Sequence, residues 1–308
     1  MNDGRPPNSS EQEALRVAFR KPLSTADLKK MKQEGTPIAM VTAYDYPSAK
    51  LAEEAGADIL LVGDSLGMVV LGYDSTIPVT MDDMVHHTKA VSRAAMTSFV
   101  VADLPFASYH GSDDKIIGNA ARLIQEGRAK AIKMEGGTEI AEAVRLCVSA
   151  GIPVMGHIGL TPQAVNQLGG YRVQGRNPEQ AKKLVEDARA LEDAGVVAVV
   201  LEMVPEELAA WITSQLTVPT IGIGAGRGCD GQVLVFHDLL QYASPVSPRF
   251  VKHYANIGEQ IRNGLSAYVS EVKNRLFPAE EHVFHMDAQF VKTLKQETEE
   301  SAGPKEDI

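Results

Sequence analysis

The sequence predicts an α/β fold in which eight parallel strands close into a (β/α)8 barrel. Three observations support this prediction. Short apolar runs rich in branched residues recur along the chain, and capped or amphipathic helical segments separate nearly all of them. Five successive runs also end on an ionisable side chain. Strands and helices that alternate in this number favour a closed barrel over an open doubly wound sheet.

The strands are predicted where the apolar runs are too short for a helix and are bounded by turn residues. They are Ile38–Ala43, Ile59–Val62, Ser98–Ala102, Ala131–Met134, Ile152–Gly156, Val197–Leu201, Thr220–Ile223 and Val233–Phe236. Only residues 224–232 lie between the last two strands, too few for an ordinary helical crossover. Either that helix is missing or the eighth strand is misplaced.

The helices are predicted from their capping residues. A capping box at Ser24–Asp27 begins a short helix to about Gln33, which could close the bottom of the barrel, and Thr80 caps a helix to about Ala95. Two long loops, Leu66–Pro78 and Gly159–Asn177, are typical of lids or binding segments. The other helices are Asp45 or Tyr46 to Ala55, Asp113–Glu126, Glu139–Ser149, Pro178–Ala194, Pro205–Gln215 and Arg249–Leu276.

The composition is that of a globular protein, and it narrows the function classes. The 308 residues carry a formal net charge of −10 and contain no Lys/Arg-rich run, which argues against nucleic acid as a main partner. Cys147 and Cys229 form no CxxC motif, so reduced thiols and a cytoplasmic location are expected. No apolar run is long enough to span a membrane, and the N-terminus has no secretory signal.

We expect one catalytic domain with two extensions. Residues 1–20 are predicted to be a disordered N-terminal extension, residues 21–278 the barrel, and residues 279–308 a largely disordered C-terminal tail.

The ionisable residues at the strand ends are the candidate site, because the C-terminal ends of barrel strands meet at one mouth. Asp64 and Asp103 are the predicted metal ligands, since carboxylates suit Mg²⁺, which needs only one or two protein oxygens. Asp64 could instead bond its own backbone in a loop. The matching positions of Asp103 and Glu135 favour the metal.

Lys133 and Glu135 are predicted to point into the barrel, because alternation places them on one face of a strand. A buried lysine needs a partner or an anionic ligand, and a purely structural Lys–Glu pair is the alternative. His157 has glycines on both sides and ends a strand, so it is a candidate, although a lone histidine is more often a satisfied polar residue.

Glu202 ends a wholly apolar strand and could transfer protons near neutral pH. The alternative is a capping role for the helix that begins at Pro205. His237, at the predicted end of the eighth strand, is a weaker candidate. The GxGxxG motif at residues 226–231 precedes a strand-like run rather than a helix, so a tight turn or backbone anion nest is expected instead of a dinucleotide site.

Seven motifs between about Thr25 and Leu276 resemble, in order and spacing, those of the ketopantoate hydroxymethyltransferase family. They are Val62-Gly-Asp-Ser-Leu-Gly-Met68, Asp103-Leu-Pro-Phe106, Lys133-Met-Glu-Gly-Gly137, Gly156-His-Ile-Gly-Leu-Thr-Pro-Gln163, Gly170-Tyr-Arg-Val-Gln-Gly175, Leu201-Glu202 and Ile221-Gly-Ile-Gly-Ala-Gly226. The resemblance implies a barrel of the phosphoenolpyruvate-mutase type, Mg²⁺, and a homodecamer of two stacked pentamers. It also implies hydroxymethyl transfer from 5,10-methylenetetrahydrofolate to 3-methyl-2-oxobutanoate, giving 2-dehydropantoate for pantothenate and coenzyme A.

The resemblance also implies roles for individual residues. Asp64 and Asp103 would ligate the metal, with Glu135 in its shell. Ser65 and Lys133 would hold the keto acid, and Glu202 would be the proton acceptor. The chemistry is consistent with this, because a metal that polarises the ketone lets a base form an enolate, which then attacks the methylene carbon. His157 is expected to hydrogen-bond the substrate or a metal-bound water.

Two other functions fit the sequence less well. A Mg²⁺-dependent C–C lyase of the isocitrate-lyase/phosphoenolpyruvate-mutase type would have a reactive cysteine on a mouth loop, and neither Cys147 nor Cys229 sits in such a motif. A non-catalytic scaffold barrel would have lost an acid from the mouth, and none is lost.

Overall fold

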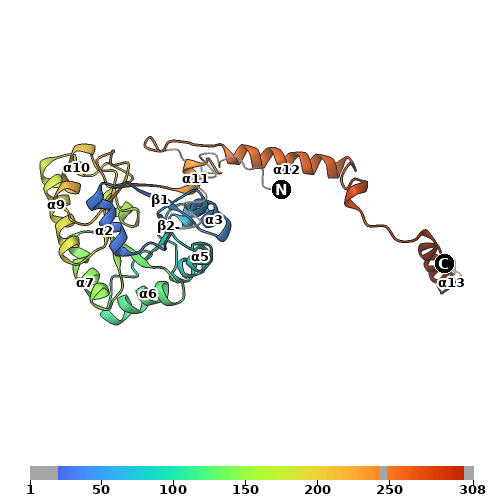
Figure 1. The fold of residues 1–308 in the computed structure, drawn as a ribbon, viewed down its shortest axis with the longest axis horizontal. Helices are drawn as coiled ribbons and strands as arrows, with labels where there is room; N and C mark the ends of the chain where they lie inside the picture. The colour runs from blue at the N-terminus through green and yellow to red at the C-terminus, as the bar shows by residue number, and fades with distance from the viewer. Residues whose placement is uncertain (1–19, 243–247, 302–308) are drawn as a thin grey trace, which may run out of the picture. The chain divides into compact units, whose positions relative to one another are not determined.

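The structure, a computed structural model, describes residues 20–242 and 248–301. They divide into two compact units, with the boundary between Asn256 and Ile257. The first unit holds the barrel, and the second holds α12 (Ile257–Lys273), a 3-10 turn η3 (Glu280–His282) and α13 (Ala288–Ser301) (Figure 1). Most of the predicted N-terminal extension lies outside the described residues.

Eight strands form a closed barrel, and each pairs in parallel with the next one in the chain until β8 pairs with β1. The predicted (β/α)8 fold is therefore confirmed. The strands are β1 (Ile38–Thr42), β2 (Ile59–Val62), β3 (Phe99–Asp103), β4 (Ala131–Glu135), β5 (Val154–Gly159), β6 (Ala198–Glu202), β7 (Thr220–Ile223) and β8 (Gly231–Leu234).

The eighth strand begins two residues earlier than predicted. Gly231 pairs with both Ile38 and Ile221. A Cβ at Gly231 would lie 2.5 Å from the carbonyl oxygen of Ile38, so the close approach of the two strands requires glycine here. The residues between β7 and β8 contain no helix in the structure, so the crossover helix is indeed missing. His237 consequently lies in the short helix α11 (Phe236–Leu239), and its prediction as a strand-end residue is wrong.

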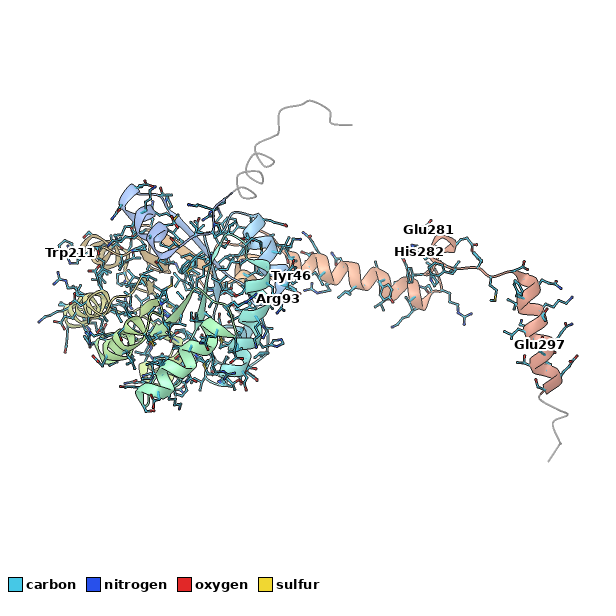
Figure 2. The ribbon with its side chains drawn as sticks, turned by 60° about the horizontal axis from the view of Figure 1, so that its bottom comes forward. Tyr46, Arg93, Trp211, Glu281, His282 and Glu297 are labelled. Atoms are coloured by element: carbon cyan, nitrogen blue, oxygen red, sulfur yellow. The ribbon has the colours of Figure 1, made fainter. Side chains whose placement is uncertain are left out.

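Six helices of the described part of the chain surround the barrel, and Figure 1 shows them as a ring around the strands. Asp45 and Thr80 cap two of them with capping boxes, as the sequence predicts for Thr80. Tyr46 and Trp211 are exposed on the outer surface of this ring (Figure 2). The helices are α3 (Tyr46–Glu54), α5 (Met81–Ala94), α6 (Asp113–Gln125), α7 (Ala141–Ser149), α9 (Pro178–Asp193) and α10 (Glu206–Gln215).

Apolar side chains fill the N-terminal part of the barrel interior. The helix α2 (Thr25–Glu34) contributes the fully buried Leu28 to this interior, so it closes the bottom as expected. Leu28 packs in one cluster with inward-facing residues of the strands, among them Ile38, Ile59, Phe99, Met155, Ala198 and Ile221. Because apolar side chains fill the lower layers, polar chemistry is confined to the C-terminal end.

The two predicted long loops contain short helical segments. In the first loop, α4 (Leu66–Val69) follows β2 directly. In the second, the 3-10 turn η2 (Pro162–Ala164) and α8 (Val165–Leu168) follow β5. Another 3-10 turn, η1 (Thr138–Ile140), precedes α7. Of these segments, α4 and η2 border the mouth, near the C-terminal ends of β2 and β5.

The C-terminal part of the chain differs from the prediction in two ways. The last long helix was expected to begin at about Arg249, but α12 begins at Ile257, because the amide of Tyr254 donates to Leu239 O and residues 251–256 are not helical. The tail was expected to be largely disordered, whereas residues 288–301 form α13. None of the helices within the described ranges is long and apolar enough to cross a membrane.

Candidate functional site

A cavity of about 500 Å³ opens at the C-terminal end of the barrel, and we call it the mouth cavity. The ends of the strands and the first residues of their following loops form its walls. The predicted site residues line it, apart from the weaker candidate His237: Asp64, Ser65, Asp103, Lys133, Glu135, His157 and Glu202. The structure therefore brings these residues together as the strand-end pattern predicts.

The strand register explains why the ionisable side chains converge. Asp103 is level with Lys133 on neighbouring strands, and Glu135 is level with His157. Glu202 is level with Gly159 on the next pair. Ile132 and Met134 alternate with Lys133 and Glu135 along β4, and they pack outward into the core under the helices. The predicted inward direction of Lys133 and Glu135 is thus confirmed.

Lys133 and His157 link three carboxylates into one buried network. Lys133 Nζ lies 3.1 Å from Asp103 Oδ1, 3.8 Å from Glu135 Oε1 and 3.2 Å from His157 Nδ1. His157 Nδ1 lies 3.3 Å from Glu135 Oε1, and its Nε2 lies 3.2 Å from Glu202 Oε2. The Lys–Glu pair therefore exists, but it is one link in a chain that runs across four strands rather than an isolated structural pair.

The protonation states of this network follow from its charges. Burial lowers the pKa of Lys133, but the surrounding carboxylates outweigh burial and raise it, so the ammonium stays charged. Burial and Lys133 also lower the pKa of His157, yet hydrogen bonds to Glu135 and Glu202 raise it to about 9. Burial opposes ionisation of Glu135, but its contacts with His157 and Lys133 lower its pKa overall. The raised pKa favours the imidazolium form of His157, whose Nδ1 faces Glu135 and whose Nε2 faces Glu202.

Asp64 and Asp103 form the acidic side of the cavity. The backbone amide of Asp64 donates to Asp103 Oδ2 at 3.0 Å, so the two carboxylates are neighbours. Burial, followed by the charges of Glu135 and Asp103, raises the pKa of Asp64 well above its ordinary value. Burial also raises the pKa of Asp103, against the opposing charge of Lys133. The cavity thus holds more buried negative charge than Lys133 alone compensates.

These residues fit a divalent cation. Apart from its ion pair with Lys133 Nζ at 3.1 Å, the buried Asp103 Oδ1 accepts no hydrogen bond of good geometry, so one of its lone pairs is available. A cation beside Asp64 and Asp103 would favour their ionised forms. In the part of the chain that the structure describes, no three Asp, Glu, His or Cys side chains form a ready-made metal cage. Two carboxylates with water or substrate in the other positions is an arrangement that Mg²⁺ accepts.

Gln163 is a residue that the sequence reasoning missed as part of the site. Its side-chain Nε2 donates to Asp64 Oδ2 at 2.8 Å and to Leu104 O at 2.9 Å. Its Oε1 accepts from Tyr109 OH at 2.7 Å, and its backbone amide donates to Glu135 Oε2 at 3.0 Å. Gln163 therefore holds two of the mouth carboxylates in place. Its only signal in the sequence was its place at the end of the Gly156–Gln163 motif.

Two further polar residues around the cavity were not predicted. Tyr44 OH lies 2.8 Å from Ser65 Oγ, so it fixes the position of the serine hydroxyl. Thr76 lines the cavity, and its Oγ1 is buried without a hydrogen-bond partner. A buried hydroxyl in this state is a contact point for a ligand.

The backbone of Glu202 is packed tightly against the end of β5. A Cβ at Gly159, where φ is +95°, would lie 2.2 Å from Glu202 O, so only glycine allows β5 to approach β6 there. The amide of Leu160 donates to the same carbonyl. The alternative capping role does not hold, because α10 has Pro205 as its N-cap and no side-chain cap hydrogen bond. The carboxylate of Glu202 contacts His157 instead.

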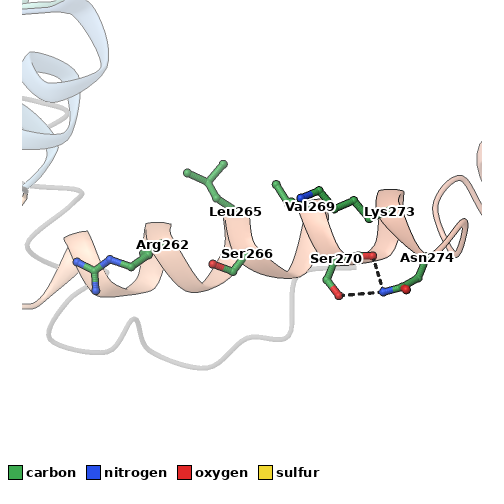
Figure 3. A pocket seen from close by; sticks show the side chains of 7 residues that line it. All are labelled: Arg262, Leu265, Ser266, Val269, Ser270, Lys273 and Asn274. Carbon is green, nitrogen blue, oxygen red and sulfur yellow. Dashed lines mark hydrogen bonds between the residues drawn. The ribbon is translucent and has the colours of Figure 1, made fainter.

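Several other candidates lie outside the mouth cavity. His237 does not line it, and its ring stacks on Tyr242 with 5.0 Å between centroids. Cys147 and Cys229 are also absent from the described lining residues. A depression of about 570 Å³ in the second unit has no acidic residue in its lining, which comes from α12 and the residue after it (Figure 3). Its lining residues are Arg262, Leu265, Ser266, Val269, Ser270, Lys273 and Asn274.

Comparison with protein families gives one match over most of the chain. A family model described as ketopantoate hydroxymethyltransferase matches residues 22–280. A protein named 3-methyl-2-oxobutanoate hydroxymethyltransferase from Thermoanaerobacter sp. (strain X514) is 59% identical over 265 residues, which cover 86% of this chain and 97% of that protein. A protein of the same name from Bacillus cereus (strain B4264) is 59% identical over 260 residues, which cover 84% and 94%.

Solved structures support the fold class. A putative phosphonomutase from Burkholderia cenocepacia J2315 aligns with a TM-score of 0.56 at 16% identity, over 81% of this chain and all of that one. A 2,3-dimethylmalate lyase, described as a member of the PEP mutase/isocitrate lyase superfamily, aligns with a TM-score of 0.54 at 18% identity, over 91% and 99%. At this identity the likeness concerns the barrel architecture, which agrees with the predicted phosphoenolpyruvate-mutase type.

Proposed function

The chain belongs to the ketopantoate hydroxymethyltransferase family, and we propose how its mouth cavity performs the reaction of that family. The reaction transfers a hydroxymethyl group to 3-methyl-2-oxobutanoate and gives 2-dehydropantoate. The one-carbon donor in this proposal is 5,10-methylenetetrahydrofolate. The observation that carries the proposal is the buried network that joins the Asp64–Asp103 pair, through Lys133 and His157, to Glu202.

Asp64 and Asp103 are the residues that would hold Mg²⁺. When bound, the ion would supply the Lewis acidity that makes the C–H beside the ketone easier to remove. Two facts support this role: the two buried carboxylates are neighbours, and Asp103 Oδ1 has no polar contact of good geometry other than its ion pair with Lys133. Glu135 faces Lys133 and His157 through Oε1 and the amide of Gln163 through Oε2. Glu135 would also lie near the bound metal.

Lys133, Ser65 and His157 would hold the keto acid. The Lys133 ammonium is charged and lines the cavity, so it can meet the substrate carboxylate and later the enolate oxygen. The Ser65 hydroxyl is held by Tyr44 and faces the same space. His157 lines the same cavity, and its imidazolium form can donate to anionic and carbonyl oxygens.

Glu202 would accept the proton from C3 of the keto acid. The raised pKa of His157 favours its protonated form, which is a poor base, so Glu202 is the better candidate. The contact of His157 with Glu202 Oε2 orients the carboxylate and leaves Oε1 for the substrate proton. Lys133 would stabilise the charge on the enolate oxygen. The enolate carbon then attacks the methylene carbon of the folate, so that a C–C bond forms while one methylene C–N bond breaks and its electron pair goes to nitrogen. Water replaces the remaining C–N bond and supplies the hydroxyl, which releases tetrahydrofolate and 2-dehydropantoate.

Assembly and location extend the proposal beyond one chain. We propose a homo-oligomer, the decamer implied by the family resemblance, that acts in the cytoplasm on small-molecule substrates. Sedimentation velocity of the full chain measures the assembly, and a monomer would contradict it.

The activity is tested with the purified full-length protein. It is incubated with 3-methyl-2-oxobutanoate, 5,10-methylenetetrahydrofolate and Mg²⁺, and 2-dehydropantoate is detected by mass spectrometry. Glu202→Gln serves as the matched inactive sample. The absence of product from the wild-type protein, under conditions where it is folded and assembled, would contradict the proposed function.

A further inference from the structure

A second depression, of about 640 Å³, lies directly beside the mouth cavity, and we call it the rim depression. It belongs to the segment between α8 and α9 and to the first turn of α9. Tyr171 and Met203 line both hollows, so the two adjoin at these residues. The lining residues of the rim depression are Tyr171, Arg172, Val173, Arg176, Asn177, Gln180 and Met203.

The two hollows have opposite charge. The mouth cavity is lined by carboxylates, whereas the rim depression has Arg172 and Arg176 and no acidic residue in its lining. Both arginines are exposed, and neither takes part in an ion pair with any other described residue. Two cations without a counterion beside an acidic cavity are suited to an anion that is attached to a group in that cavity.

Tyr171 lies at the boundary between the two hollows. Its side chain is half exposed, and its hydroxyl lies 3.8 Å from Met68 Sδ. Burial, followed by the charges of Glu202, Asp64 and Glu135, raises the pKa of Tyr171. The hydroxyl of Tyr171 therefore interacts electrostatically with the carboxylates of the mouth cavity. A flat ring at this boundary can stack on an aromatic group that passes from one hollow to the other.

The backbone that carries the two arginines is held in place. Gly175 has φ +81°, and a Cβ there would lie 2.6 Å from Leu208 Cδ2, so glycine is required for the close packing of this segment. The amide of Gln174 donates to Met203 O at 2.8 Å, and its side chain donates to Arg172 O at 2.9 Å. The rim depression therefore exists before any ligand binds.

The one-carbon donor of the proposed function has the matching shape and charge. Its methylene carbon must reach the enolate beside Glu202, while its p-aminobenzoyl ring and glutamate tail extend away from the pterin. The tail is anionic, so it cannot lie on the acidic walls of the mouth cavity without repulsion. The adjoining rim depression is basic and can hold the tail.

We infer that the rim depression binds the anionic glutamate tail of the folate co-substrate through Arg172 and Arg176, with the p-aminobenzoyl ring passing over Tyr171. This inference rests on the proposed function and adds a site to it. It makes the number of glutamates a determinant of affinity. Each carboxylate that meets an arginine adds a charge-assisted hydrogen bond.

The test compares ligands that differ only in the tail. Tetrahydropteroate has no glutamate, tetrahydrofolate has one, and tetrahydropteroyltriglutamate has three. Their dissociation constants for the full-length protein are measured by isothermal titration calorimetry at two ionic strengths. We expect affinity to rise with glutamate number and the gain to shrink at high salt, because exposed charges are screened.

Variants of Arg172 and Arg176 test whether these two arginines bind the glutamate tail. The double variant Arg172→Ala/Arg176→Ala should lose roughly tenfold or more in affinity for the triglutamate and little for tetrahydropteroate. Arg172→Lys keeps a charge and should lose less than Arg172→Ala. The control is Arg93→Ala, a charge removal on α5 at the outer surface (Figure 2), which should leave all three affinities unchanged.

The outcomes separate this inference from the proposed function. If the double variant keeps the wild-type dependence on glutamate number, or if the wild type shows none, the rim depression does not bind the tail. In that case the proposed function would still be supported if the wild-type protein exchanges the C3 proton of the keto acid for deuterium. If the wild type neither exchanges that proton nor forms 2-dehydropantoate, the proposed function itself is wrong.

Discussion

The side-chain amide of Gln163 donates to Asp64, with Nε2 2.8 Å from Oδ2, across 99 residues of sequence. Tyr109 OH lies 2.7 Å from the other end of this amide, which fixes its orientation. Groups that orient a metal-ligating carboxylate often matter nearly as much as the ligand itself. The hydrogen bond therefore links a loop residue with no obvious chemistry of its own to the proposed metal site.

Gln163→Leu should weaken Mg²⁺ binding by roughly tenfold to a hundredfold, because Asp64 loses the hydrogen bond that orients it. Isothermal titration calorimetry with Mg²⁺ alone measures this without turnover. Gln167→Leu, an exposed position on α8, is the matched control. A Gln163→Leu protein that is folded by circular dichroism and binds Mg²⁺ like the wild type would show that Asp64 needs no such support.

Asp64→Asn and Asp103→Asn should each abolish Mg²⁺-supported formation of 2-dehydropantoate and leave the barrel folded. Asparagine keeps the shape of each side chain and removes the charge that the cation requires. Turnover is measured as a function of Mg²⁺ concentration, with far-UV circular dichroism as the check on folding. The metal assignment is wrong if either variant retains the wild-type Mg²⁺ dependence.

Glu202→Gln should bind Mg²⁺ and the keto acid almost normally but lose roughly a hundredfold or more in turnover, because it removes only the proton acceptor. Deuterium exchange at C3 of the keto acid, measured by NMR without folate, isolates this step. The control is Glu207→Gln, an exposed acid in the first turn of α10. Exchange at the wild-type rate in Glu202→Gln would assign the base to another group.

Glu53 should make stability depend on pH at the bottom of the barrel. Its carboxylate accepts hydrogen bonds from the backbone amides of Met96, Thr97 and Ser98. Burial raises the pKa of Glu53, but these amides outweigh burial and lower it below its ordinary value of 4.5. A lowered folded-state pKa means that the stabilisation is fully present above the unfolded-state pKa and is lost as the pH falls through the folded-state value.

Glu53→Gln should therefore lower the free energy of unfolding by about 2 kcal/mol at pH 7, with the difference from wild type shrinking below about pH 4. Urea unfolding followed by circular dichroism at several pH values gives this difference. Glu54→Gln, the exposed neighbour on α3, should change little at any pH. A constant difference between Glu53→Gln and wild type across this pH range would argue against ionic hydrogen bonds at Glu53.

The local features of the chain were sufficient for most of the fold. Apolar runs bounded by turn residues predicted β2 and β7 to the residue, and the capping box at Thr80 predicted the start of α5. Strand alternation also predicted that Lys133 and Glu135 face inward. These predictions succeeded because periodicity and capping depend on neighbouring residues along the chain.

Other features depended on contacts between distant segments. The start of β8 was not visible, because Gly231 has no side chain to mark a strand and is required there only by the approach of β1. The last long helix begins late because the preceding residues bond to α11. Neither contact has a local signature in the sequence.

For the site, the sequence by itself determined which ionisable residues end the strands and therefore reach one mouth: Asp64, Asp103, Glu135, His157 and Glu202. Only the tertiary structure decided which of them touch. The contact of His157 with Glu202 and that of Gln163 with Asp64 each join separate elements. The physical reason is that barrel closure sets the register of neighbouring strands and the course of the loops above them, whereas strand periodicity sets only the face on which a side chain lies.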